Sequence, residues 1–167
     1  MPYDRDEIVT SLTSFYKFLT YTHIPESALK LPPEGGWPEL TDEWLSFINK
    51  SSAVNDLIRH LPYIEHSRGN PYEICRRSYP IDFMGGEIRE FRSRGVAEPQ
   101  ESASLAKVPE NVLTISIAPG REGSYLMVDT KRGTITVMDG ECPTQPTELS
   151  QKVPVYQSLP ACDLYIR

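Results

Sequence analysis

Residues 112–138 constrain the fold of this chain more than any other segment. They read VLTISIAPGREGSYLMVDTKRGTITVM, three apolar stretches joined by two glycine-containing turns. Leu113, Ile115 and Ile117 alternate with polar residues, which is the pattern of a strand with one buried face. Gly133 supplies the positive φ that a tight hairpin turn needs. The segment therefore predicts a three-stranded antiparallel meander.

The chain before this meander has the pattern of helices. Asp4, followed three residues later by Glu7, predicts a capped helix over residues 4–21. A second helix is expected to begin at Thr41, and a third one is expected over residues 52–61, ending before Pro62. The first helix has an apolar stripe at helical spacing, made of Ile8, Leu12, Phe15, Tyr16 and Leu19.

The segment between the helices and the meander has weaker signals. Short strands are expected on either side of Pro80, at residues 72–74 and 81–83. Residues 84–110 are polar and rich in helix-breaking residues, which predicts a long polar surface loop. Residues 141–167 are expected to form an irregular C-terminal part.

These patterns predict one α+β domain over residues 1–167. In this domain the N-terminal helices of residues 1–66 pack on a mainly antiparallel sheet of about four to six strands. The meander occupies residues 111–140. A chain of this length can bury roughly 70% of its unfolded surface, which is enough for one hydrophobic core.

The composition excludes several classes of protein. A net charge of −6 argues against a nucleic-acid binder, which needs a basic surface. Residues 1–66 carry ten Asp and Glu against five Lys and Arg. No apolar run reaches the ~18 residues of a membrane span, and the N-terminus has no signal-peptide core. Three widely spaced cysteines fit reduced thiols. We therefore expect a cytoplasmic protein, with the nucleus left open.

The sequence predicts no catalytic residues, no cofactor and no metal. His60 and His66 lie six residues apart across a proline, whereas helical ligand pairs are spaced by three or four. Cys75 could meet either histidine in the fold, but a buried structural cysteine is favoured. Gly85-Gly86 and Gly120-Arg121-Glu122-Gly123 favour turns over phosphate sites because neither matches a phosphate-loop pattern.

Three segments together resemble proteins of the SUKH superfamily, and more closely uncharacterised filamentous-fungal proteins of this type. That superfamily includes fungal cell-wall-assembly regulators and bacterial immunity proteins. The similarity covers about residues 30–140 and implies a non-enzymatic, protein-binding module. Such domains usually close with a helix, so the chain ends either in a reduced helix or in a truncation, and an uncovered sheet face could permit self-association. The three segments are Pro33-Glu34-Gly35-Gly36-Trp37-Pro38, residues 54–64, and Gly120-Arg121-Glu122-Gly123 with the strands that follow.

Four residues are candidates for contacts with a partner protein. Trp37 either packs on the helices beneath it or faces a partner as an aromatic anchor. Arg59 either stabilises the C-terminus of the third helix or binds a ligand. Arg121 and Glu122 occupy a loop tip, where they are either solvated or in a specific charged contact, for example near Asp129.

Two functions of different classes remain open from the sequence. The first is an intracellular interaction or regulatory module with an unknown protein partner. The second is a small enzyme or a ligand-binding accessory protein, for example of a fungal biosynthetic pathway. A deep pocket with converging histidines, Cys75 or buried carboxylates favours the second function, whereas a flat exposed patch favours the first.

Overall fold

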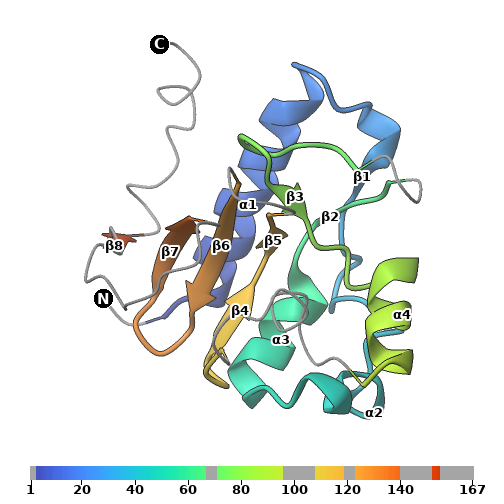
Figure 1. The fold of residues 1–167 in the computed structure, drawn as a ribbon, viewed down its shortest axis with the longest axis vertical. Helices are drawn as coiled ribbons and strands as arrows, with labels where there is room; N and C mark the ends of the chain where they lie inside the picture. The colour runs from blue at the N-terminus through green and yellow to red at the C-terminus, as the bar shows by residue number, and fades with distance from the viewer. Residues whose placement is uncertain (1–2, 67–70, 96–107, 119–122, 140–151, 155–167) are drawn as a thin grey trace.

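The protein has an α+β fold in which helices come first and most strands follow (Figure 1). The computed structural model describes residues 3–66, 71–95, 108–118, 123–139 and 152–154. All strand pairs in these ranges are antiparallel. The predicted α+β class is therefore confirmed.

Helix α1 (Arg5–Thr20) forms where the sequence predicts it. The Asp4 carboxylate accepts hydrogen bonds from the backbone N–H groups of Asp6 and Glu7, at 2.9 and 3.1 Å. These bonds satisfy two of the amides that a helix N-terminus leaves without partners. One face of the helix is buried, through Ile8, Leu12, Tyr16 and Leu19.

The connection to the next helices contains short ordered elements. The 3₁₀ turn η1 (Glu26–Ala28) leads into β1 (Leu29–Lys30), which pairs with β2 (Tyr63–Ile64). Thr41 caps α2 (Asp42–Leu45), which continues as η2 (Ser46–Ile48).

Helix α3 (Ser52–His60) is the third predicted helix. Ser51 caps it through a hydrogen bond to the backbone N–H of Val54. Its buried face consists of Val54, Leu57 and Ile58. The start of the second helix and the position of the third are therefore confirmed.

The predicted meander is present as β4 (Val112–Thr114), β6 (Ser124–Asp129) and β7 (Thr134–Asp139). A fourth strand, β8 (Lys152–Pro154), extends this sheet in the order β4-β6-β7-β8. The expectation that residues 141–167 are wholly irregular is therefore wrong at β8. A strand this short is defined by its pairing with β7 rather than by its own pattern, and the rest of that segment lies outside the described residues.

The first predicted strand of the meander is divided in two. After β4 the chain leaves the main sheet, and β5 (Ser116–Ile117) pairs instead with β3 (Tyr79–Pro80). Ile115 joins the two sheets, because its N–H bonds to the Leu126 carbonyl while its own carbonyl accepts from Ile81. The described strands thus form three sheets.

Two predictions for the middle of the chain are wrong. Residues 72–74 and 81–83 are not strands. Among the described residues the strand in this region is β3, which contains Pro80 itself and pairs with β5 only. This edge position suits proline, because proline has no N–H to donate to a second neighbouring strand. Residues 84–110 are not one continuous loop, because Gly86–Ser93 forms helix α4. This helix is stabilised by tertiary contacts, since Ile88 is buried and Phe91 packs against the core.

The main core lies between α1, α3 and one face of the β4-β6-β7 sheet. Val128 from β6 contributes to it, together with Leu113 from β4. The alternate residues Tyr125 and Met127 face the other way and form a smaller cluster with Val108 and Ala118. Helix α4 lies to one side of this core, across from the sheet (Figure 1).

Candidate functional site

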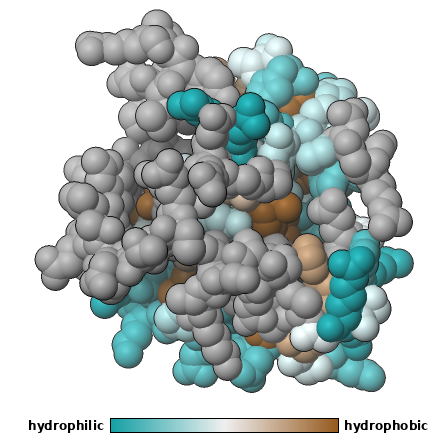
Figure 2. All heavy atoms as spheres, in the orientation of Figure 1, coloured by the Kyte–Doolittle hydropathy of each residue, from teal (hydrophilic) through white to brown (hydrophobic). Residues whose placement is uncertain are grey.

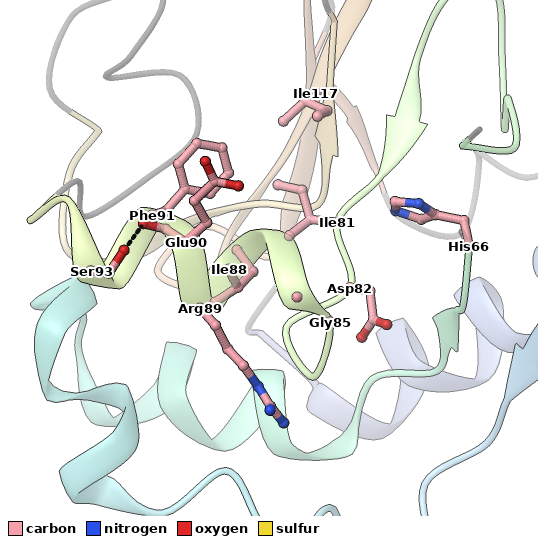
Figure 3. Close-up of a pocket in the computed structure, with 11 residues that line it drawn as sticks. His66, Ile81, Asp82, Gly85, Ile88, Arg89, Glu90, Phe91, Ser93 and Ile117 are labelled. Atoms are coloured by element: carbon pink, nitrogen blue, oxygen red, sulfur yellow. Dashed lines mark hydrogen bonds between the residues drawn. The ribbon is translucent and has the colours of Figure 1, made fainter. Parts of the chain in front are cut away.

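A cavity of about 450 Å³ lies beside α4 and the β3–β5 pair. His66 is on one side and α4 on the other, with Ile81 and Ile117 between them (Figure 3). The volume falls within the roughly 300–1,000 Å³ range of ligand pockets. The lining combines four apolar side chains, five polar ones and two glycines, and consists of His66, Ile81, Asp82, Gly85, Gly86, Ile88, Arg89, Glu90, Phe91, Ser93 and Ile117.

A turn before α4 places Asp82 at the cavity. The Asp82 carboxylate accepts a hydrogen bond from the Met84 N–H at 2.9 Å, and its carbonyl accepts one from the Gly85 N–H at 2.9 Å. Gly85 is the N-cap and offers no side chain to the helix. Gly86 follows in open space, because a Cβ added there would meet no atom within 4 Å. The turn expected at these glycines is thus the entry into a helix.

The Asp82 carboxylate is in an environment that disfavours its charge. Burial raises the pKa of Asp82, and the nearby Glu65 carboxylate raises it further. Hydrogen bonds from the Met84 and Gly85 backbone and the proximity of His66 act in the opposite direction. Within the described ranges no lysine or arginine forms an ion pair with Asp82.

The charged side chains of α4 are largely engaged with neighbours. Arg94 forms an ion pair with Glu90 one turn earlier. Arg92 lies over the rings of Trp44 and Phe47, at 5.7 and 5.8 Å from their centroids, which fastens α4 to the α2–η2 segment. Arg89 is exposed, and its guanidinium points away from Ile81 and Ile117 (Figure 3).

Trp37, a predicted partner-binding residue, is tied to the fold. Its indole N–H donates to the Leu61 carbonyl at 2.9 Å, and its backbone N–H donates to the Arg59 carbonyl at 2.8 Å. Its half-buried ring stacks on Tyr63, with the ring centroids 5.8 Å apart. These contacts agree with the interpretation that the ring packs on the helices beneath it, and they fix residues 31–41, the linker between β1 and α2, on α3.

Arg59 also has internal partners. Its Nε donates to the Leu40 carbonyl at 2.6 Å, and its guanidinium pairs with Asp42 in the first turn of α2. The side chain therefore leaves its own helix and secures the start of α2. Neither Trp37 nor Arg59 lines the cavity.

Arg121 and Glu122 lie outside the described residues. Asp129, the contact expected for them, accepts hydrogen bonds from the Asn111 side chain and from the backbone N–H groups of Lys131 and Arg132. This carboxylate therefore organises the β6–β7 hairpin.

The residues considered for nucleophilic or metal chemistry do not all lie at the cavity. His66 lines the cavity, whereas His60 contacts the Asp56 carbonyl at 2.8 Å and Cys75 is not in the lining. Burial raises the pKa of the Cys75 thiol, which disfavours the reactive thiolate. Among the described residues, no group of three or more His, Cys, Asp or Glu could hold a metal ion.

The large exposed apolar side chains of the described residues lie outside the cavity lining. The large apolar side chains exposed in the described ranges are Phe18, Tyr21, Leu31 and Val137, and the cavity lining includes none of them. Hydrophobic residues are visible near the middle of the face in Figure 2, in the region between β5 and α4, with hydrophilic residues along the lower edge. No helix in the described part of the chain is both long and apolar enough to span a membrane.

Sequence reasoning did not single out Asp82 as a functional candidate. The signal was an aspartate three residues before a glycine pair, followed by Ile88 and Phe91 at helical spacing. This pattern is short and also occurs in loops, so it does not identify a site by itself. Asp82 lies at the cavity only because α4 packs beside it.

Comparisons with family models, curated proteins and solved structures return no match to this chain.

Proposed function

We propose that this chain is a non-catalytic intracellular interaction module of SUKH-like type, and that the α4 cavity receives a side chain of its protein partner. The observation that carries the proposal is the mixed lining of a cavity of about 450 Å³, with isoleucines between polar groups. Interfaces gain most of their binding energy where a few anchor side chains fill such pockets. The order of helices first and antiparallel meander second agrees with the SUKH-like expectation.

The internal roles of Trp37 and Arg59 favour the cavity as the binding surface. Both side chains donate hydrogen bonds to backbone carbonyls, at Leu61 and Leu40. A partner that used them as anchors would have to break these bonds, which costs binding energy. The cavity offers an anchoring position without this rearrangement.

A second candidate function is a small-molecule binding protein or a small enzyme. It is favoured by one observation, that His66 and Asp82 line the same cavity. A carboxyl group whose pKa is raised by burial, with a histidine in the same cavity, is a common arrangement in acid–base sites.

Two variants of Gly86 provide a matched test of the cavity. A Cβ at Gly86 meets no atom within 4 Å, so Gly86→Trp should place a large ring beside the cavity, whereas Gly86→Ala adds only the Cβ. Both are incubated with an extract of the source cells, and the captured proteins are quantified by mass spectrometry. A partner bound by the wild type and by Gly86→Ala but lost from Gly86→Trp supports the proposal. Equal capture by all three proteins contradicts it.

A thermal-shift screen with metabolites separates the two candidates. A ligand that binds only the folded state raises the melting temperature, and the stabilisation grows with the logarithm of one plus the ratio of the ligand concentration to Kd. A metabolite that stabilises the wild type and Gly86→Ala but not Gly86→Trp would favour the second function.

A further inference from the structure

We infer that the side chain received by the α4 cavity is a lysine or an arginine of the partner, with its aliphatic stem against the isoleucines and its charged end beside Asp82. This inference rests on the proposed function and specifies the chemistry of the partner. Lysine and arginine are the side chains that combine a long apolar stem with a cationic end.

The apolar part of the cavity suits such a stem. Ile81 and Ile88 are 7% and 2% exposed, so both side chains are packed against the protein behind the cavity wall. Ile117 and Phe91 are half-buried and complete the apolar lining. A methylene chain placed on the exposed parts of Ile117 and Phe91 removes apolar surface from water on both partners.

The polar part of the cavity favours a positively charged group. A carboxylate that is partly withdrawn from water is destabilised unless a positive charge or hydrogen bonds compensate it. Asp82 receives backbone hydrogen bonds, and the ionisable side chains that act on it are His66 and the like-charged Glu65. Glu65 itself is engaged with Lys30 at 3.0 Å. A cation entering the cavity therefore gains an ion pair that the described residues do not supply.

The wider charge distribution favours the same partner. The chain carries a net charge of −6, with ten acidic and five basic residues among residues 1–66. Such a field attracts basic segments and increases their rate of encounter. An anionic anchor at the N-terminus of α4 is disfavoured, because the Asp82 carboxylate already bonds to the Met84 amide just before that terminus.

The inference is tested with small probes that imitate a lysine side chain. The backbone ¹⁵N–¹H resonances of Gly85, Gly86 and Ile88 are followed while n-butylammonium chloride is added. Sodium butyrate and sodium chloride at matched ionic strength serve as the anionic and salt controls. We expect saturable shifts with n-butylammonium only, and apparent affinity weakened by about fivefold or more in Asp82→Asn.

Asp82→Asn preserves an oxygen acceptor for the Met84 N–H, so the turn should persist. Glu26→Gln, at an exposed position in η1, removes the same charge away from the cavity and should leave the affinity unchanged. Equal shifts with butyrate, or the same affinity in Asp82→Asn as in the wild type, would overturn the inference.

The two proposals fail in different ways. If Gly86→Trp loses the protein partner while n-butylammonium leaves the cavity resonances unchanged, the interaction module stands and the cationic anchor is wrong. If Gly86→Trp retains the partner, the cavity is not the interface, and the inference falls with the proposed function whatever the probes do.

Discussion

Replacing Gly36 with alanine should destabilise the fold through a contact that its neighbour Gly35 does not make. Gly36 and Gly35 have nearly equal backbone angles, φ +86° and +87°. A Cβ on Gly36 would lie 2.7 Å from the Arg59 carbonyl oxygen, whereas a Cβ on Gly35 would meet nothing within 4 Å. The same carbonyl accepts the Trp37 N–H, so this substitution disturbs the linker–α3 junction.

The magnitude follows from two contributions. A left-handed conformation costs an alanine about 1–2 kcal/mol at either position. At Gly36 the carbonyl must also move, which weakens a hydrogen bond with a net value of about 1 kcal/mol. We therefore expect the free energy of unfolding to fall by about 2–3 kcal/mol for Gly36→Ala, and by only about 1–2 kcal/mol for Gly35→Ala.

Urea denaturation followed by tryptophan fluorescence and by circular dichroism measures both values. Equal m-values would show that the variants unfold from comparable states. Gly35→Ala is the matched control, because it carries the backbone strain without the contact. The reasoning is refuted if the two variants lose the same stability, since the Arg59 carbonyl would then have no effect.

Three further predictions concern the linker and the cavity. Trp37→Ala should lower the free energy of unfolding by about 2–4 kcal/mol, because it removes the ring packing and the N–H bond to Leu61; unchanged stability in urea would contradict this role. Arg59→Gln should lower the free energy of unfolding by about 1–2 kcal/mol, because it removes the hydrogen bond to the Leu40 carbonyl. Asp42→Asn should change it by less than about 0.5 kcal/mol, because the Asp42 side chain is 89% exposed. A larger loss in Asp42→Asn than in Arg59→Gln would show that the ion pair, and not the Leu40 hydrogen bond, carries the effect of Arg59. Asp82→Asn should be more stable than the wild type at neutral pH. The reason is that the pKa of Asp82 is raised in the folded state, so ionisation of its carboxyl group at neutral pH opposes folding. This advantage should disappear as the pH falls through the raised pKa toward the ordinary value of 3.8, and a pH-independent difference in melting temperature would refute it.

The elements that the sequence predicted well have local causes. Asp4, Thr41 and Ser51 each cap the helix that follows, through hydrogen bonds spanning two or three residues. Gly133, at φ +62°, closes the β6–β7 hairpin between strands that pair directly. Such signals are complete within a short window of sequence and need no distant partner.

Helix α4 is different because distant residues stabilise it. Its segment has mostly polar residues, and Ile88 is the only buried one among the side chains of the helix that the structure describes. Arg92 contacts Trp44 and Phe47, which lie more than forty positions earlier in the chain. The prediction of a loop was wrong because these contacts have no local signature.

The sequence by itself determined the class of this protein, the limits of α1 and α3, the start of α2, and the three strands of the meander. Local caps, turns and periodicity set these features, and they act over a few residues. Only the tertiary structure decided that Trp37 and Arg59 are engaged internally, that β5 leaves the meander for β3, and that Asp82 and His66 meet at one cavity. The physical reason is that burial and the surroundings of a charge depend on residues far apart in the chain, which no local pattern records.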